Sequence, residues 1–441
     1  PLGAQSYDGR ALGAEIRRLR PPLREITVAG MMIGSSKDLP HFLNVLRSPR
    51  SFAYVARLML RYGLDLVRYG RSMRLTNGNA LVARLARSVF DLGIPLWTSA
   101  PVTQLLIDDG QVTGAVVTRD GSAVRVQARS GVVLATGGFP QNRALRARLF
   151  PHAPDGQAHW SPAPPGNTGD GLALGQSAGG HLMTDLPHAA AWVPVSLVPQ
   201  PDGSGNPFPH FVDRGKPGMI AVAGRGKRFV NEGRSYHDFC QAMVSACAGA
   251  PETCAWLICD HPTLRRYGLG FAKPQPVPVG HLVRNGYLRR GATLADLAQE
   301  TGLDPNTLAQ TVARVNTDAA SGVDTEFGRG TLAYNRYLGD PTVRPNSAFG
   351  PVQAGPFYAV KLVMGDLGTF AGLRTDAKAR VIDADNQPVP GLYAVGNDAA
   401  SIMGGNYPGG GITLGPALVF GFIAGRGIAA DRQAERGARA V

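Results

Sequence analysis

The sequence predicts an α/β fold built around a parallel sheet, and two apolar runs carry this prediction. Residues 391–398 form a short apolar run that ends in Gly-Asn-Asp, which is typical of a buried parallel strand leading into a ligand loop. A glycine-rich loop over 404–416 follows, and then an apolar helix over 417–430. Residues 131–135 form a second apolar run, which ends in Thr-Gly-Gly.

Short strands separated by turns precede the run at 131–135. Asp109-Gly110 and Asp120-Gly121 are residue pairs typical of tight hairpin turns. A β-meander inserted between two parallel strands is typical of the glutathione-reductase type of fold, which binds a flavin or a nicotinamide dinucleotide. The predicted strands cover 95–98, 101–107, 112–118 and 124–128.

The remaining elements divide the chain into three segments. Helices are predicted over 53–70 and over 80–92, the second capped by Asn77-Gly78-Asn79. From about residue 193 the pattern changes to mixed strands and helices, including helices over 293–301 and 305–320. We expect a cofactor-binding domain in two parts, with an α+β catalytic or cap domain inserted between them. The three segments are 1–192, 193–365 and 366–441.

Composition restricts the classes of partner. The 441 residues are 44% hydrophobic and 17% charged, with a net charge of +13. The arginines are scattered and not interleaved with aromatic residues, so we expect no nucleic-acid binding. A solvated basic surface, attraction to an anionic cofactor and attraction to a membrane surface remain open. The amphipathic stretch 53–69 either lies on lipid or packs on the protein itself.

No uninterrupted apolar run reaches the length of a membrane span, and we expect none. The four cysteines show neither disulfide nor metal-type spacing, which favours a reducing cytoplasm. The histidines form no metal-ligand pattern, and we expect no metal.

A loose dinucleotide fingerprint occurs at 169–175, but the preceding residues 161–167 contain three prolines and are not a strand. We interpret this stretch as a helix N-terminus capped by Thr168. No other Gly-x-Gly-x-x-Gly motif occurs, although a flavin fold of this type begins with a βαβ unit that holds the pyrophosphate. We therefore expect an N-terminally incomplete cofactor-binding domain.

The glycine loop before the last helix has the features of a ligand site. Its bare N–H groups and the positive end of the helix dipole suit an anion, or a ring that takes on negative charge. Tyr407 stands inside this loop, and Gly411 follows four residues later. The Tyr407 hydroxyl and the Gly411 N–H could reach one carbonyl oxygen, although a mere packing role for Tyr407 is the alternative.

These motifs resemble those of 3-ketosteroid Δ1-dehydrogenases, members of the fumarate reductase/succinate dehydrogenase flavoprotein superfamily. The resemblance covers essentially the whole chain, and Tyr-Pro-Gly-x-Gly is its most specific motif. It rests on Asn231-Glu232, Ser235-Tyr236, Asp366-Leu367-Gly368-Thr369, Gly372-Leu373, Gly391 to Asn397 and Tyr407 to Gly411.

The resemblance implies an FAD enzyme that desaturates a bond next to the 3-ketone of a steroid. Tyr407 and Gly411 would polarise the ketone, and Tyr236 would be the base. Because a free phenol has a pKa near ~10, Tyr236 needs a neighbouring donor or positive charge. A tyrosine outside the chain, Arg234 and His237 are the candidates. An ordinary half-buried aromatic is the alternative for Tyr236.

The same resemblance implies which residues hold FAD. Thr413 and Leu414 would face the ring, and the loop at 396–398 would face the ribityl and phosphate region. Asp398 could instead cap the next helix. The full set is Gly78, Asn79, Ala80, Leu81, Val102, Ala135, Thr136, Gly137, Gly138, Gly396, Asn397, Asp398, Thr413 and Leu414.

Other functions remain open at this point. A fumarate-reductase-like enzyme, a Δ4 desaturase or a flavoprotein acting on another cyclic ketone would keep the flavin. A truncated, inactive fragment would bind no FAD. We expect a steroid-like small molecule as substrate and a quinone or redox protein as electron acceptor. The expected location is cytoplasmic, with peripheral membrane association as a further expectation.

Overall fold

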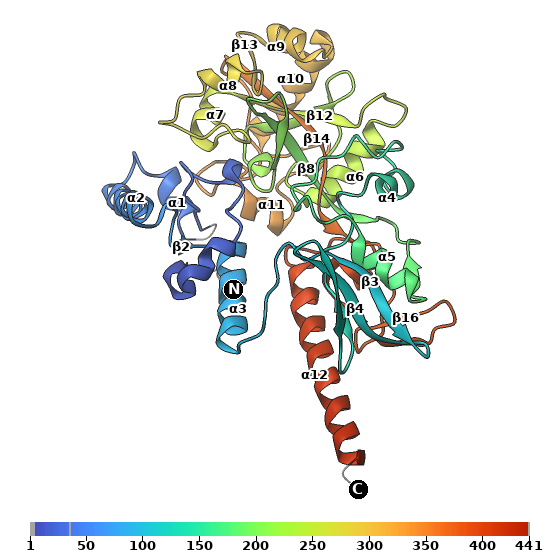
Figure 1. The fold of residues 1–441 in the computed structure, drawn as a ribbon. Helices are drawn as coiled ribbons and strands as arrows, with labels where there is room; N and C mark the ends of the chain where they lie inside the picture. The colour runs from blue at the N-terminus through green and yellow to red at the C-terminus, as the bar shows by residue number, and fades with distance from the viewer. Residues whose placement is uncertain (1–4, 35–36, 440–441) are drawn as a thin grey trace.

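The computed structural model describes residues 5–34 and 37–439, with a large antiparallel sheet at one end and smaller sheets at the other (Figure 1). The large sheet has the strand order β11–β10–β12–β14–β8–β9, and β13 also pairs with β14. Its strands are β8 (Ala190–Pro199), β9 (Gly205–Pro209), β10 (Met219–Ala223), β11 (Lys227–Arg228), β12 (Cys254–Asp260), β13 (Arg289–Gly291) and β14 (Phe357–Thr369).

Helices pack around this sheet, and two of them match the prediction. In α9 the Thr293 hydroxyl accepts from the Asp296 N–H, and the Asp296 carboxylate accepts from the Thr293 N–H. Leu297 and Leu308 of α9 and α10 share a buried cluster with Ile220 of the sheet. The helices are α6 (Tyr236–Ala246), α7 (His261–Tyr267), α8 (Gly280–Arg284), α9 (Leu294–Thr301), α10 (Pro305–Ser321) and α11 (Ala333–Leu338).

A buried ion network fastens the large sheet to the loop after α10. The Glu232 carboxylate accepts hydrogen bonds from Arg228 Nε at 2.9 Å, Arg329 Nη1 at 3.0 Å and the Ala221 N–H at 3.0 Å. Arg228 also donates to Asp324. Because Glu232 is fully buried, the two guanidinium groups supply the compensation that a desolvated carboxylate requires.

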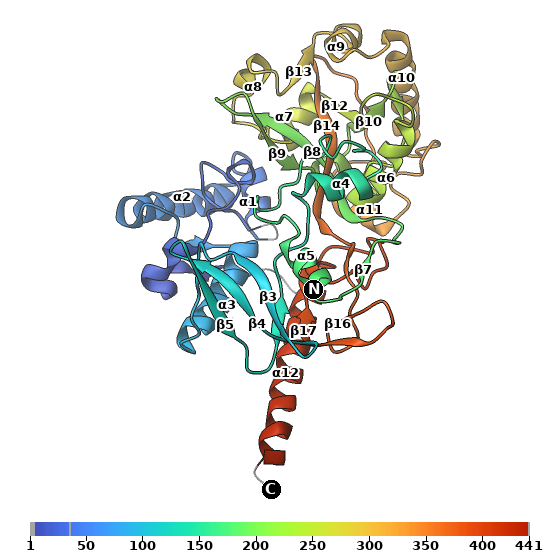
Figure 2. The ribbon, with the colours of Figure 1, turned by 45° about the vertical axis from the view of Figure 1, so that its right-hand side comes forward.

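The predicted parallel pair is present. β6 (Val132–Leu134) pairs in parallel with β17 (Pro388–Ala394), which also pairs with β16 (Arg380–Ile382). The meander of β3 (Val102–Asp108), β4 (Gln111–Arg119) and β5 (Ser122–Gln127) packs beside β17 (Figure 2). Both Asp-Gly turns form, with all four residues in the left-handed region. The meander prediction is thereby confirmed.

Some local predictions are wrong. Residues 95–98 form no strand, and Leu96 and Trp97 are exposed without a pairing partner. Thr168 does not cap α5 (Asp170–Ser177): Gly169 does, in the left-handed conformation, and Thr168 donates to Asp170 instead. Shorter elements in this region are α4 (Arg143–Leu149), β7 (Leu182–Met183) and β15 (Gly372–Leu373).

The N-terminal part contains two longer helices, which start earlier than predicted. α2 begins at Pro49 because Ser48 caps it, and α3 begins at Asn77, so the predicted cap residues lie inside its first turn. Leu12, Ile16 and Leu75 form a small separate core under α3. The elements are β1 (Tyr7–Asp8), α1 (Leu39–Leu43), α2 (Pro49–Tyr69), β2 (Arg74–Leu75) and α3 (Asn77–Asp91).

The last helix, α12 (Leu414–Arg439), extends away from the body (Figure 1). By length and composition its segment Leu414–Gln433 could cross a membrane, which corrects the expectation that no segment could. Phe420, Ala424 and Ile428 pack with Tyr393 and Val395 at the end of β17. This face therefore docks α12 on the parallel pair.

The proposed segment boundaries at 192/193 and 365/366 fall inside β8 and β14. These two strands pair with each other at Val193 and Gly365. The division into a cofactor-binding domain and an inserted domain stays a prediction. Both of its boundaries lie in the paired strands β8 and β14.

Candidate functional site

Two tyrosines that are distant in sequence meet in the structure. The hydroxyl groups of Tyr236 and Tyr407 are hydrogen-bonded, and their ring centroids lie 4.8 Å apart. Tyr236 is the first residue of α6, whose N-cap Ser235 accepts from the Asp238 N–H. Tyr407 comes from the glycine loop before α12. The structure thus brings together the two phenols expected to be catalytic.

Aromatic neighbours hold both phenols in place. The buried His237 ring lies 5.8 Å from the Tyr407 ring at an interplanar angle of 23°. The edge of Phe211 contacts Tyr236, with ring centroids 5.4 Å apart. The Trp192 N–H donates to His237 Nδ1 at 3.1 Å, so the proton of the neutral imidazole lies on Nε2. The sequence offered His237 as a neighbour of Tyr236, and the structure places its ring against Tyr407.

The environment of the pair determines its protonation state. Burial raises the pKa of Tyr236 and of Tyr407. Their mutual hydrogen bond raises the pKa of Tyr236 further and opposes the rise for Tyr407. Both groups are therefore neutral phenols at pH 7. When one of them loses its proton, the other can donate to the phenolate.

The loop after Tyr407 has an accessible backbone. Gly411 is exposed and has a φ of 102°, in the region that favours glycine. A Cβ atom at Gly409, Gly410 or Gly411 would meet no other atom within 4 Å. The Gly411 carbonyl accepts from the Gly415 N–H at 2.7 Å and so begins α12. The amide groups of this loop are open to a ligand.

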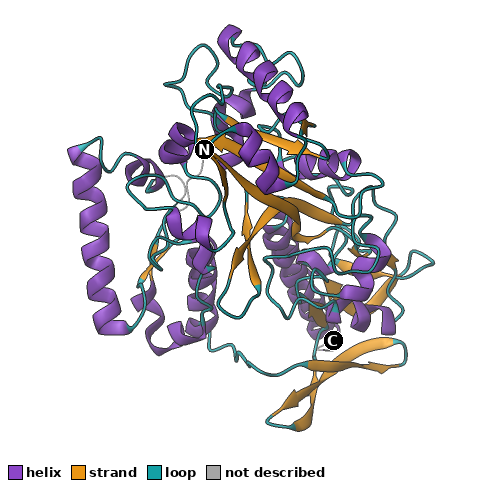
Figure 3. Cartoon of the chain, turned by 90° about the horizontal axis from the view of Figure 1, so that it is seen from above, coloured by secondary structure: helices purple, strands orange, loops and turns teal. Residues whose placement is uncertain are grey.

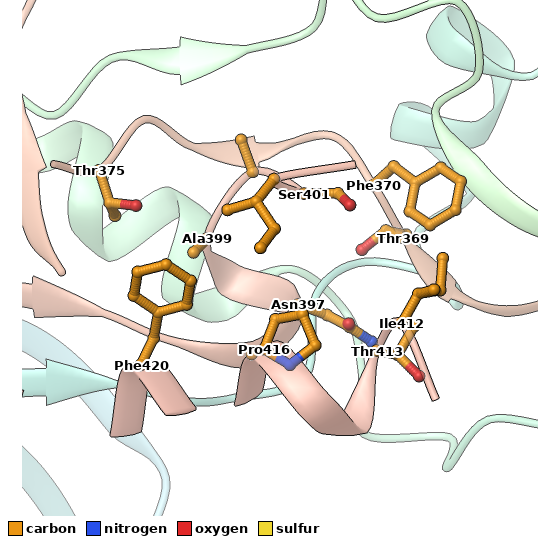
Figure 4. A pocket seen from close by; sticks show the side chains of 13 residues that line it. Thr369, Phe370, Thr375, Asn397, Ala399, Ser401, Ile412, Thr413, Pro416 and Phe420 are labelled. Atoms are coloured by element: carbon orange, nitrogen blue, oxygen red, sulfur yellow. The ribbon is translucent and has the colours of Figure 1, made fainter. Parts of the chain in front are cut away.

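A pocket lies between the end of β14, the turn after β17 and the start of α12 (Figure 4). Phe370 and Ile412 line it, and both belong to the hydrophobic cluster against which Tyr407 packs. The pocket therefore adjoins the tyrosine pair. Its lining also includes Thr369, Thr375, Gly396, Asn397, Ala399, Ala400, Ser401, Ile402, Thr413, Pro416 and Phe420.

Thr369 offers the pocket an unused hydroxyl. Its side chain is buried, its Oγ1 atom has no hydrogen-bond partner, and the residue lines the pocket (Figure 4). Asp366, three residues earlier, accepts from the Gly368 N–H at 2.7 Å and is paired with buried His159 at 2.6 Å. These bonds hold the irregular end of β14 that carries Thr369. In the sequence, the single indication of Thr369 was its place in the Asp366-Leu367-Gly368-Thr369 motif, which belongs to the family resemblance.

Asp398 joins the two parallel strands at their carboxyl ends. Its fully buried carboxylate accepts from the Thr136 N–H, from the Thr136 hydroxyl at 2.9 Å and from the Gly138 N–H at 2.9 Å. A Cβ at Gly138 would lie 2.1 Å from Thr369 Oγ1, so glycine is required for this close packing. Asp398 therefore sets the shape of the loop wall and caps no helix through its side chain.

The other residues expected to hold FAD lie in different places. Gly396, Asn397 and Thr413 line the pocket of Figure 4. Gly78 and Asn79, at the start of α3, line a second cavity of about 480 Å³. The remaining residues line neither of these two spaces: Ala80 and Leu81 on α3, Val102 at the start of β3, Ala135 to Gly138 after β6, Asp398, and Leu414 at the start of α12.

The pocket itself is small, about 30 Å³, but the chemistry of its lining suits the edge of a flavin ring. Thr369 supplies an unpartnered buried hydroxyl, and the open amides before α12 supply donors at the positive end of a 26-residue helix. Phe370 and Ile412 supply an apolar wall. An aromatic ring with polar edges requires such a combination.

Comparisons with known proteins agree with this assignment. A model of the FAD binding domain family matches residues 2–414. The 4-oxocyclohex-2-ene-1-carboxylate 5-dehydrogenase of Sinomonas cyclohexanicum is 43% identical over 98% of the chain and 73% of the relative. The 3-oxosteroid 1-dehydrogenase of Mycolicibacterium smegmatis is 36% identical over 98% of the chain and 75% of the relative.

One solved structure is also similar over nearly the whole chain. The 3-ketosteroid Δ1-dehydrogenase of Sterolibacterium denitrificans superposes with a TM-score of 0.87 at 35% identity, over 97% of this chain and 76% of that one. The predicted fold class and FAD as cofactor are confirmed. The chain belongs to the FAD binding domain family and is an FAD-dependent dehydrogenase of the fumarate reductase superfamily.

Proposed function

We propose that the protein introduces a C=C bond next to the ring ketone of a 3-ketosteroid, at the Δ1 position. The hydrogen-bonded pair of Tyr236 and Tyr407, adjoining a pocket whose lining residues suit a flavin edge, is the observation that carries this proposal. The similarity to 3-oxosteroid 1-dehydrogenases supports it. FAD, when bound, supplies the acceptor for the hydride removed from the substrate.

The first task of the protein is to make a C–H bond next to the ketone acidic. We assign to the Tyr407 O–H and the Gly411 N–H the two hydrogen bonds to the ketone oxygen. Their loop has an accessible backbone, and Tyr407 is held by His237 and by the pocket wall. A preformed donor to a developing enolate typically contributes about 3 kcal/mol to the lowering of the barrier.

The second task is to remove the proton, which we assign to Tyr236. In the free protein Tyr407 can donate to a Tyr236 phenolate. When a ketone binds, the same Tyr407 O–H turns to the ketone oxygen, and the phenolate loses a donor and gains proton affinity. With FAD bound, the substrate would give one proton to Tyr236 and one hydride to the acceptor that FAD supplies, so that the C=C bond would form.

A second candidate substrate is an oxocyclohexene carboxylate. The relative at 43% identity is named for 4-oxocyclohex-2-ene-1-carboxylate, and both relatives' names describe dehydrogenation of a ring that carries a ketone. The same tyrosine pair serves either substrate, because the group it recognises is the ring ketone. The two candidates differ only in what surrounds that ring.

A dicarboxylate substrate has less support. It would require arginine and histidine side chains in the pocket to hold the two carboxylates, and Arg329 and Arg374 are the arginines considered for this role. In the structure Arg329 is buried and donates to Glu232, to Met219 O and to Lys216 O. Arg329 is thus occupied by the ion network of the large sheet.

The test is dye reduction by the FAD-loaded protein with three substrates: androst-4-ene-3,17-dione, 4-oxocyclohex-2-ene-1-carboxylate and succinate. The dye replaces the physiological acceptor, which we propose to be a quinone or a redox protein. We expect turnover of the steroid to the 1,4-diene, identified by mass spectrometry. Turnover of the carboxylate alone would select the second candidate, and turnover of succinate alone would contradict both.

A further inference from the structure

The α2 helix presents an apolar face to solvent, and no element among residues 5–34 and 37–439 covers it. Only Ser51 of its 21 residues is buried. Phe52 is 59% exposed, Leu60 68%, Leu64 63% and Val67 90%. Figure 1 shows α2 at the edge of the molecule, and Figure 3 shows the same helix from the side, as a rod. Large apolar side chains exposed to this extent on one helix indicate an interaction surface.

The spacing of these residues places them on one stripe. Phe52, Ala56, Leu60 and Leu64 follow one another at intervals of four residues, and Val67 completes the row. Such positions lie on one face of an α-helix. We call this set the α2 stripe.

Hydrogen bonds from the opposite face of α2 to the rest of the protein keep the α2 stripe facing solvent. The Tyr54 hydroxyl donates to Asp38 at 2.7 Å, and the Tyr62 hydroxyl donates to Ala29 O at 3.0 Å. Asp65 accepts from the Met73 N–H at 2.9 Å. These three bonds tie one side of α2 to the protein and leave the stripe on the other side.

Cationic groups border the stripe. Arg57, Arg61 and Arg68 are exposed and follow its edge at helical spacing. Asp65 is the only acid in α2, and it lies on the opposite, tied face. The border of the stripe is therefore complementary to an anionic partner.

We propose that α2 docks the protein on an anionic membrane, with the α2 stripe among the upper acyl chains and Arg57, Arg61 and Arg68 at lipid phosphates. An apolar stripe with a basic border is the combination that an interfacial helix requires. The net charge of +13 adds long-range attraction to such a surface. One helix face offers less apolar area than a stable protein dimer buries, which favours lipid over a second copy.

The proposal is independent of the steroid assignment, and vesicle sedimentation tests it. The FAD-loaded protein is mixed with phosphatidylcholine vesicles with or without phosphatidylglycerol. We expect binding to the anionic vesicles that weakens with salt. The double variant Leu60→Glu/Val67→Glu and the triple variant Arg57→Gln/Arg61→Gln/Arg68→Gln should each bind at least about tenfold less.

Matched controls separate this surface from others. Arg125→Gln/Arg129→Gln/Arg289→Gln removes the same charge elsewhere, and Tyr337→Glu adds an acid at another exposed site; both should bind like the wild type. Phe422→Glu tests the exposed side of α12. All of these side chains are exposed, so circular dichroism and thermal melting should be unchanged.

Three results would overturn the proposal. The α2 variants could bind vesicles as well as the wild type does. The loss could instead occur with Phe422→Glu, which would assign membrane binding to α12. Finally, sedimentation in solution could show that the wild type is a dimer and that Leu60→Glu/Val67→Glu makes it a monomer, so that a second copy covers the stripe.

Discussion

The Tyr236 hydroxyl is hydrogen-bonded to the Tyr407 hydroxyl, although 171 residues separate the two in the chain. One phenol stands on the first turn of a helix beside the large sheet, and the other on the glycine loop that leads into the last helix. Substrate chemistry at this point would depend on the packing of α6 against that loop.

Replacement of either phenol should abolish most of the turnover. We expect Tyr236→Phe and Tyr407→Phe each to lower kcat by at least ~10²-fold with FAD still bound, because one removes the base and the other a donor to the ketone. The double variant should be little worse than the single ones, because the two residues act as a unit. Steady-state kinetics measure this, and Tyr337→Phe is the control. Near-full activity in both single variants would remove the mechanism.

The pH dependence should follow the phenol that acts as base. Burial raises the pKa of Tyr236 above that of free tyrosine, ~10, so only a small fraction is phenolate at neutral pH. The value of kcat/KM should therefore rise with pH between about pH 6 and pH 9 without a plateau. In Tyr236→Phe this rise should be absent. A wild-type profile that is flat over the same range would mean that another group removes the proton.

Thr369 should bind the flavin through its hydroxyl. We expect Thr369→Val to weaken FAD binding about fivefold, because a net hydrogen bond contributes about 1 kcal/mol. The visible absorbance of the bound flavin should also shift. Thr369→Ser should restore both properties, and Thr375→Val, in the same pocket, is the matched control. Fluorescence titration measures the FAD affinity, and absorbance spectra show the shift. If Thr369→Val behaves like the wild type in both, the flavin does not use this hydroxyl.

Asp398 should matter for folding as well as for the cofactor loop. Asp398→Ala leaves the Thr136 and Gly138 N–H groups without their acceptor. We expect the free energy of unfolding to fall by about 3 kcal/mol, measured by urea denaturation without added FAD. Asp385→Ala, at an exposed position, should have little effect. An unchanged urea midpoint for Asp398→Ala would contradict this assignment.

The ion network of Glu232 should make stability sensitive to acid. Two arginines hold the pKa of this buried carboxyl below its ordinary 4.5, against the opposing effect of burial. A lowered pKa means that its contribution is present above pH 4.5 and is lost as pH falls through the folded-state value. Glu232→Gln should cost about 3 kcal/mol at neutral pH.

Urea denaturation of the wild type and of Glu232→Gln over a pH series checks this prediction. The difference between the two proteins should shrink as the pH falls below about 4.5. Glu252→Gln, which breaks an exposed pair with Lys361, is the control. A difference that stays constant from neutral to acid pH would exclude the linkage.

The sequence predicted those parts of the fold whose signals are local. The Asp-Gly pairs form the turns of the meander. The two apolar runs have the pattern of parallel strands, and they pair with each other as β6 and β17. The strand predicted over 95–98 does not form, because a strand needs a neighbouring strand to pair with and Leu96 and Trp97 have no such partner. Trp97 lies under the Arg119 guanidinium instead, at 4.6 Å.

The sequence could predict which residues belong to the site, but not which of them contact one another. Tyr407 was identified from its place in the glycine loop and Tyr236 through a family resemblance, while their mutual hydrogen bond depends on tertiary packing and has no local signal. Asp398 illustrates the same limit. An aspartate at this position could cap a helix or bind the cofactor. Only the structure shows that it accepts hydrogen bonds from Thr136 and Gly138, more than 250 residues away.

The most direct test of the tyrosine pair is anaerobic mixing of the FAD-loaded protein with androst-4-ene-3,17-dione, while the visible absorbance of the flavin is followed. We expect the wild type to lose this absorbance and to yield one equivalent of the 1,4-diene, and Tyr407→Phe to keep its absorbance. Bleaching of both proteins at the same rate would contradict the claim that the Tyr236–Tyr407 pair activates the ketone.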